Sequence, residues 1–418
     1  MRIVVCVFFV FLMAVSLSAR ENTGDDLTIK IAIFGPGDEI YSWFGHNVLI
    51  IEDAYTGQSQ FYNYGLFSYE SEDFILNFVL GRMLYSAFST ENDIADYIKQ
   101  NRDVVLYTLD LPPEKREEVR EFAEISILPE NRDYIYHLFK DNCSTRIRDI
   151  IDIAVDGQFK KQLDNTPGRF TFRQHARRHI WFSPFWDWTL NFLMGRDIDQ
   201  PITVWDEMYL PLEVANQIMN FSYKDMHGIS HKLVSNVETI YLSHNRPAVL
   251  DAPSRQWPAV LIFSLIFSSF IGFLFFLQSK KPVVGRIMLG IFHSILGLCI
   301  GCAGVLLFFV SFFTDHDYTF HNANLLFCNP ILLAAVPLGI QYASSNNYNK
   351  RLFAEISLRI IWFLMIIGVF ISISIRQENL AVEVLILPIA ITFSLEPIGL
   401  KKLLTRIFGR CKGNRKMA

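Results

Sequence analysis

The feature that most constrains the fold of this chain is a series of apolar segments from Trp257 onward. A bilayer-spanning helix needs about 20 apolar residues, and the last two segments reach that length only if flanking charges lie at the membrane interface. The composition, with 51% hydrophobic residues, is also too apolar for an ordinary soluble protein. We therefore predict an all-α membrane bundle of about five helices within residues 257–398. The segments cover about residues 258–277, 287–313, 325–341, 360–375 and 384–395.

Lys and Arg residues between these segments indicate how the chain crosses the membrane. They follow the first, third and fifth segments, as with Lys280 and Lys281 after the first and Lys350 after the third, whereas the other two loops are acidic or nearly neutral. Cytoplasmic loops carry an excess of Lys and Arg. The pattern places residues 20–256 outside the cytoplasm and the basic tail, residues 399–418, inside it.

The N-terminus has the layout of a signal peptide. Met1 and Arg2 precede an apolar stretch, which ends in the small residues Ser18 and Ala19 before a polar segment. Residues 1–19 are therefore predicted to be a signal peptide, with an uncleaved membrane anchor as the alternative. In either case the following segment is exported.

The exported segment, residues 20–256, is predicted to be one α+β domain. Two β-prone runs, joined by the turn-rich residues 53–57, predict a hairpin that carries His46 near its start. The predicted strands cover residues 27–34, 46–52, 60–65 and 104–109, and the predicted helices cover residues 70–80, 91–102, 113–128 and 143–155.

Of the six cysteines, Cys143 alone lies in the exported segment, so no disulfide framework is expected there. Asp141 and Asn142 precede a helical pattern, which predicts a helix that they cap, with Cys143 in its first turn. The helix dipole and the nearby Arg146 favour the thiolate, so we expect a lowered thiol pKa and a catalytic nucleophile. The alternatives are a buried small hydrophobic residue or a residue without a role.

His46 is the predicted general base for this thiol, because it is a polar imidazole that opens an apolar strand. Asn63, on the paired strand, is the candidate for a third catalytic member that orients the imidazole. His137, which shortly precedes Cys143, is a possible substitute base.

Two other features remain open at this stage. Residues 169–194 interleave aromatic and basic side chains, which suits either a bilayer interface or a core helix packed on the sheet. His175 and His179 share a helix face, but a third ligand and a general base are missing, so surface or headgroup contact is favoured over zinc. We predict no metal and no cofactor. The net charge of -4 offers no footprint for nucleic acid.

Four ordered motifs in the exported segment carry a family resemblance. They are Phe44-Gly45-His46, Tyr62-Asn63-Tyr64-Gly65-Leu66-Phe67, Asp141-Asn142-Cys143-Ser144-Thr145-Arg146 and Met208-Tyr209-Leu210-Pro211. A histidine strand upstream of an Asn-Cys helix start resembles circularly permuted papain-like folds, the group that includes lecithin:retinol acyltransferase and permuted NlpC/P60 enzymes. More specifically, the motifs resemble the exported domain of Lnb-type lipoprotein N-acyltransferases, over about residues 29–212. A multi-span C-terminal region also occurs in that family.

The resemblance implies a permuted papain-like, NlpC/P60-like exported domain and an acyltransferase of the bacterial inner membrane. Cys143 takes a fatty acyl group from a phospholipid as a thioester, and the α-amine of a diacylglyceryl lipoprotein then accepts that group. Within the motifs we assign substrate binding to Tyr62, Tyr64, Asn142 and Arg146. A cysteine peptidase or amidase of cell-wall peptides, and a non-catalytic envelope binding protein, are the alternatives.

Overall fold

The computed structural model describes residues 24–67, 73–90 and 94–394, so the predicted signal peptide and basic tail lie outside the described residues. The chain divides into two compact units. The sheet unit comprises the described residues up to 74 with 83–168 and 203–246, and the helical unit comprises residues 75–82, 169–202 and those from 247 on. The predicted exported segment therefore contributes to both units.

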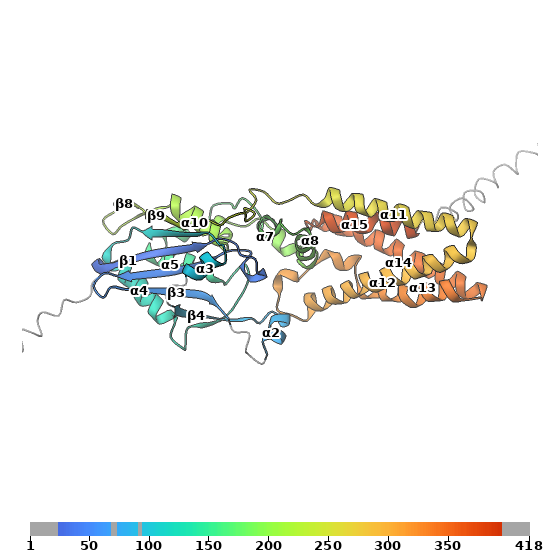
Figure 1. Cartoon of the computed structure of the whole chain (residues 1–418), viewed down its shortest axis with the longest axis horizontal. Coiled ribbons are helices and arrows are strands. Elements are labelled where there is room, and N and C mark those ends of the chain that lie inside the picture. The colour runs from blue at the N-terminus through green and yellow to red at the C-terminus, as the bar shows by residue number, and fades with distance from the viewer. Residues whose placement is uncertain (1–23, 68–72, 91–93, 395–418) are drawn as a thin grey trace, which may run out of the picture. The chain divides into compact units, whose positions relative to one another are not determined.

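Within the described residues, seven antiparallel strands form the main sheet of the sheet unit, in the order β6-β4-β3-β2-β1-β5-β9 (Figure 1). The strands predicted from sequence correspond to β1, β2, β3 and β5, which lie side by side at its centre. A separate hairpin joins β7 (Ser222–Lys224) to β8 (Ser230–Lys232). The strands of the main sheet are β1 (Leu27–Phe34), β2 (His46–Asp53), β3 (Gln58–Leu66), β4 (Leu84–Thr90), β5 (Val104–Leu109), β6 (Asp133–Ile135) and β9 (Val234–Tyr241).

Successive side chains of β2 point to opposite faces of the main sheet, and each face carries its own apolar cluster. Leu49 and Ile51 belong to the larger apolar cluster, which includes Ile147 and Ile150 of helix α5. Val48 and Ile50 belong to a second cluster on the other face. The helices of this unit are α3 (Ile94–Lys99), α4 (Pro113–Ser126), α5 (Cys143–Ala154), α6 (Gln158–Leu163), α9 (Val204–Glu207) and α10 (Pro211–Asn220).

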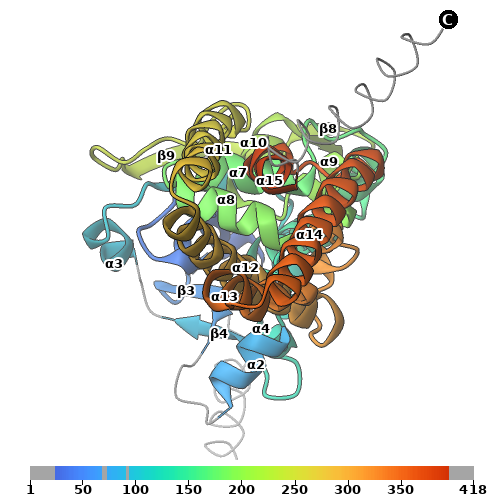
Figure 2. The same cartoon turned by 90° about the vertical axis from the view of Figure 1, so that its right-hand side faces the viewer.

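Most of the helical unit is a bundle in which α12 packs on α13, and α15 packs against both α11 and α14 (Figure 2). The close approach of α12 to α13 requires small residues, since a Cβ added at Gly290 would lie 2.5 Å from the carbonyl oxygen of Gly339. The long helices are α11 (Trp257–Lys280), α12 (Pro282–Phe312), α13 (Ala335–Ser344), α14 (Tyr348–Ile375) and α15 (Leu380–Ser394).

Among the described residues, four segments are long and apolar enough to span a membrane, and α15 is a shorter apolar helix. The predicted α+β class followed by a helical membrane bundle is confirmed. The third span differs from a regular helix, because the 3-10 turns Ala323–Leu326 and Pro330–Ala334 precede α13. Pro330 lacks the N–H group that a continuous helix would need at that point.

The aromatic and basic segment, residues 169–194, belongs to the helical unit and forms helices α7 (Phe172–Ile180) and α8 (Pro184–Leu193), of which α7 is largely buried whereas Phe182 and Phe185 are exposed. Arg173 is 0% exposed and forms an ion pair with Asp199 at 2.5 Å, so its charge is satisfied inside the protein. His175 and His179 are also buried, which makes the predicted surface or headgroup contact wrong. Helix α8 packs on the membrane helices, since Phe192 belongs to the core of the bundle and Trp188 and Leu193 pack against that core.

Two predicted helices of the exported segment are shorter than expected. Helix α2 (Phe74–Leu80) starts after the predicted residue 70, and α3 ends at Lys99 instead of residue 102. Residues 70–72 and 91–93 of these predictions lie outside the described residues. Helices α4 and α5 match the predicted ranges to within two residues.

Candidate active site

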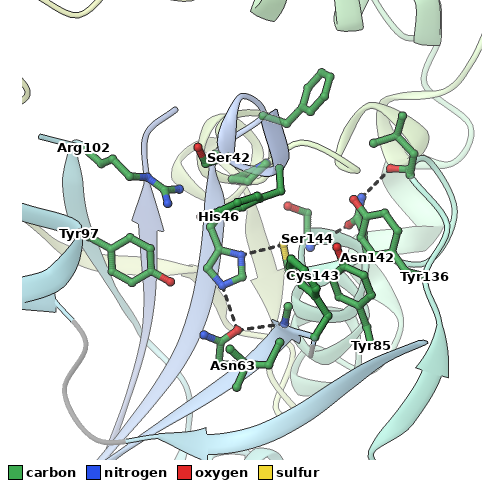
Figure 3. Close-up of a pocket in the computed structure, with 18 of the residues that line it drawn as sticks. Ser42, His46, Asn63, Tyr85, Tyr97, Arg102, Tyr136, Asn142, Cys143 and Ser144 are labelled. Atoms are coloured by element: carbon green, nitrogen blue, oxygen red, sulfur yellow. Dashed lines mark hydrogen bonds between the residues drawn. The ribbon is translucent and has the colours of Figure 1, made fainter. Parts of the chain in front are cut away.

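The site lies where the two central strands β2 and β3 stop pairing. Their ladder ends at the pair Leu49 and Tyr62, so His46 at the start of β2 lies beyond its last pair. The first turn of α5 lies at this opening and brings Cys143 to the imidazole (Figure 3). The three predicted catalytic residues therefore come together from three elements.

Asn142 defines the start of α5 and hence the position of the thiol. It has an extended backbone, with φ −143°, and its side-chain oxygen accepts hydrogen bonds from the N–H groups of Ser144 and Thr145. The Thr145 hydroxyl accepts a hydrogen bond from the Asn142 N–H in return. The side-chain amide of Asn142 also donates to the carbonyls of Leu138 and Tyr209. This network fixes Cys143 as the first residue of the helix.

The geometry around His46 determines which ring nitrogen carries the proton. Nδ1 lies 3.1 Å from the sulfur of Cys143, and Nε2 lies 3.0 Å from Oδ1 of Asn63. The same Oδ1 accepts the backbone N–H of Gly65 at 2.9 Å, so this atom of Asn63 acts as an acceptor. Nε2 must then be the protonated nitrogen, and Nδ1 presents its lone pair to the S–H group. The Nδ1 lone pair of His46 therefore lies within hydrogen-bond distance of the thiol, which is the geometry that proton transfer from S–H to the imidazole requires.

Burial decides the charge state of this pair. Burial raises the pKa of the Cys143 thiol to about 11 and outweighs the hydrogen bonds from the backbone N–H groups of Asn47 and Ser144, which lower it. Burial and the charge of Arg102 lower the pKa of His46 to about 4, against the bond to Asn63. The lowered thiol pKa predicted from sequence is wrong in its net direction. At neutral pH the resting pair is a neutral thiol and a neutral imidazole.

A cavity of about 380 Å³ opens onto Cys143 and His46. About half of the lining residues are aromatic or aliphatic, and the others are polar side chains and two glycines (Figure 3). Among the described residues that line it, Arg102 is the only cation and Asp96 the only acid. The aromatic and aliphatic lining residues are Tyr41, Phe44, Leu66, Phe67, Tyr85, Tyr97, Tyr136, Leu138, Tyr209 and Pro211.

Two of the lining residues, Gly65 and Arg102, were not among the predicted site residues. A Cβ at Gly65 would lie 2.5 Å from Cε1 of His46, so the imidazole occupies the space that a side chain would fill. A glycine inside a strand pattern is the sequence signal for such a close approach. Arg102 had no local signal, because it reaches the cavity through the pairing of β5 with β1.

The structure does not bring the predicted substrate-binding residues together at the cavity. Tyr62 and Tyr64 are buried in the core on the α5 side, where their hydroxyls bond Gln60 and Ser126. Arg146 pairs with Asp141 at 2.9 Å and stacks over the ring of Tyr134. Asn142 does line the cavity, with its side chain committed to the helix cap.

The alternative base and a metal centre have little support from the geometry. His137 uses Nδ1 to accept the N–H groups of Phe139 and Lys140. Its neighbours Tyr136 and Leu138, rather than His137 itself, line the cavity. In the part of the chain that the structure describes, no group of three or more His, Cys, Asp and Glu side chains converges as metal ligands do.

Comparison with known proteins adds two family matches. Residues 16–178 match the model of the Lnb N-terminal periplasmic domain, and residues 255–399 match the model of the Lnb transmembrane domain. The two matches follow each other in the chain and include all three residues of the Cys143, His46 and Asn63 constellation in the first. No curated protein and no solved structure gave a match.

Proposed function

We propose that this protein is a thiol acyltransferase that N-acylates bacterial lipoproteins. The chain belongs to the Lnb family, and it is a membrane protein with a periplasmic N-terminal domain. The observation that carries the proposal is the 3.1 Å contact between Cys143 Sγ and the unprotonated Nδ1 of His46, at the wall of an aromatic cavity. Cys143 is the nucleophile, His46 the general base, and Asn63 the residue that orients the base.

In the first half-reaction the donor is a phospholipid ester. Nδ1 of His46 takes the thiol proton as the sulfur of Cys143 attacks the ester carbonyl carbon. The N–H groups of Asn47 and Ser144, which face the sulfur, stabilise the oxyanion of the tetrahedral intermediate. The C–O bond then breaks, the glycerol oxygen takes the proton from His46, and a lysophospholipid leaves a thioester on Cys143.

In the second half-reaction the acceptor is the free α-amine of a diacylglyceryl lipoprotein. The amine nitrogen attacks the thioester carbonyl and loses a proton to Nδ1 of His46. The C–S bond breaks, and His46 returns the proton to the sulfur, which restores the thiol. Throughout both halves Oδ1 of Asn63 accepts a hydrogen bond from Nε2–H of His46 and stabilises the imidazolium whenever it forms.

The membrane helices and the aromatic wall support lipid substrates over soluble peptides. Donor and acceptor are both held in a bilayer, and an enzyme held in the same bilayer gains effective concentration. The aromatic and aliphatic part of the cavity wall suits an acyl chain. We propose the bacterial inner membrane as the location, with the C-terminus in the cytoplasm, since Lys280 and Lys281 lie where α11 meets α12 and Lys350 lies in the first turn of α14, which follows α13.

The test is complementation in bacteria that lack their own N-acylating enzyme, with lipoprotein N-termini read by mass spectrometry. The wild type should convert diacyl to N-acylated lipoprotein, and Cys143→Ala and His46→Ala should each lower the rate at least about 1,000-fold. Cys299→Ala is the matched control, because Cys299 is a free cysteine of α12 remote in sequence from the motifs.

A diacyl form left unchanged by the wild type contradicts the proposal. Normal acylation by Cys143→Ala contradicts the thioester mechanism, whatever the overall activity. The same strains should be digested for muropeptides, because a thiol and an imidazole also hydrolyse amides when water is the acceptor. Muropeptide cleavage that depends on Cys143, without any change in lipoproteins, would instead identify a cell-wall peptidase.

A further inference from the structure

We propose that Arg102 forms a phosphate-binding subsite, which holds the phosphodiester of the acyl donor while its ester reaches Cys143. The identity of the donor rests on the proposed function, but the binding of phosphate is a separate property of the cavity. None of the four sequence motifs contains Arg102.

Arg102 is a buried cation that lacks a full set of partners. The residue is 4% exposed, and its Nη2 group has no hydrogen-bond partner within the described residues. The Nε group donates to the carbonyl of Gly35 at 2.8 Å, and the guanidinium carbon lies 4.8 Å from the centre of the Tyr97 ring. A buried charge is stabilised only when it is paired, so an open N–H group on a buried guanidinium indicates an anionic ligand.

The rest of the cavity wall does not supply that anion. Asp96, the only acid among the described lining residues, accepts a hydrogen bond from Lys99 at 2.8 Å. The hydrogen bonds that reach the thiol come from Asn47 and Ser144, and the resting thiol is neutral. Arg102 lines the cavity, and because its unpartnered Nη2 atom is enclosed by protein, a ligand that enters the cavity would reach that atom once the guanidinium rotates.

The position of Arg102 matches the chemistry of a glycerophospholipid. Figure 3 shows Arg102 and Tyr97 on the side of His46 away from Cys143. In the donor a glycerol backbone separates the ester carbonyl from the phosphate, so the carbonyl can lie at the sulfur while the phosphate lies beyond the imidazole. A guanidinium offers paired N–H groups that fit phosphate oxygens, and burial strengthens such bonds.

The experiment measures binding separately from catalysis. The full-length Cys143→Ala protein in maltoside detergent is titrated calorimetrically with dihexanoyl phosphatidylglycerol, dihexanoylglycerol and inorganic phosphate. Arg102→Gln should weaken phosphatidylglycerol binding about 10- to 100-fold and leave dihexanoylglycerol binding unchanged. The affinity of Arg102→Lys for phosphatidylglycerol should lie between those of the parent protein and Arg102→Gln. Arg120→Gln, which removes a cation from α4 outside the cavity wall, should bind as the parent does.

If Arg102→Lys lost affinity equally for phosphatidylglycerol and dihexanoylglycerol, the subsite would be overturned, because Arg102 would then only support the fold of the cavity. Unchanged phosphatidylglycerol binding by Arg102→Gln also overturns it. Inorganic phosphate that binds as tightly as the lipid would identify a free-phosphate site and overturn the donor assignment. If the subsite holds but the wild type never forms a Cys143 thioester, the acyltransferase proposal fails and the subsite remains.

Discussion

At the scale of single residues, Asn63 determines how the imidazole can act. Its Oδ1 receives both Nε2–H of His46 and the N–H of Gly65, which leaves Nδ1 as the only nitrogen that can accept the thiol proton. Asn63→Ala should lower the rate of Cys143 acylation about 10- to 100-fold, because the competing tautomer becomes populated. Asn63→Asp, which keeps an acceptor at this position, is the control and should retain more activity. Rapid-quench mass spectrometry of the thioester measures the acylation rates of the two variants. A rate for Asn63→Ala equal to that of the wild type would refute the role of Asn63 in orienting the imidazole.

The pKa values of the pair predict a characteristic pH dependence of alkylation. With a thiol pKa of about 11 and a His46 pKa of about 4, neither group titrates near neutrality in the free protein. The thiolate fraction of Cys143, and hence its alkylation by iodoacetamide, should rise about tenfold per pH unit from about pH 7 to about pH 9. Parallel labelling of Cys143→Ala corrects for Cys299 and Cys302, which are exposed. A plateau across neutral pH would instead reveal a thiolate paired with an imidazolium.

Gly65 provides the space that the imidazole of His46 occupies. In Gly65→Ala the new methyl group meets Cε1, which lies between two nitrogens that are each held by a hydrogen bond, so His46 must move away from Cys143 or Asn63. We expect a loss of about 10- to 100-fold in thioester formation, on the scale of removing general-base catalysis in part. Gly272→Ala, in α11 with open space around it and without a positive φ, serves as the control for glycine replacement. Full activity of Gly65→Ala would contradict the requirement for this space.

Sequence reasoning could reach some of these residues and not others, for a physical reason. Cys143 was recognisable because it has no other cysteine in its segment, and His46 because it opens an apolar strand. Both signals are local. The pKa of the thiol depends instead on how much protein surrounds it, which is a tertiary property, and the local helix-dipole effect is smaller. Arg102 reaches the cavity through strand pairing, so no local pattern marks it.

At the scale of elements, the cap of α5 links the helix to its surroundings. Asn142→Ala should remove the two cap hydrogen bonds and those to the carbonyls of Leu138 and Tyr209, and lower the free energy of unfolding by about 2 kcal/mol. Asn142→Asp keeps the cap but loses the hydrogen bonds that the side-chain amide donates to Leu138 and Tyr209. Its free energy of unfolding should lie between those of Asn142→Ala and the wild type. Thermal unfolding in detergent compares the three proteins. Equal stability of Asn142→Ala and the wild type would show that the cap is not what holds the thiol.

Element prediction succeeded where burial gives a regular pattern. The central strands β1, β2, β3 and β5 were recognisable as apolar, β-prone runs, and the amphipathic helix α4 because one face of it is buried. The edge strand β9 was not, since most of its residues are exposed and nothing alternates along it. At the opposite edge, β6 has three residues, too few to show a period.

At the scale of the whole molecule, the two units share one interleaved chain. Residues 169–202 leave the sheet unit after residue 168 and pack with the membrane helices before the chain returns at residue 203. In the helical unit Phe192 is 6% exposed, and its carbonyl accepts hydrogen bonds from the side chains of Asn322 and Asn324. A fragment cut before α11 would therefore keep the α7 and α8 segment and lose the membrane helices that pack on it.

This interleaving predicts that a secreted fragment of residues 24–246 is not a soluble monomer. Without the membrane helices Phe192 becomes exposed, at a cost of about 2–3 kcal/mol for that side chain alone, and Trp188 is uncovered beside it. Size-exclusion chromatography without detergent should show aggregates, and the double replacement Trp188→Ser with Phe192→Ser should raise the monomer fraction. A monodisperse wild-type fragment would mean that α7 and α8 fold with the sheet unit alone. The boundary that matters for dissecting this protein would then follow the sequence rather than the packing.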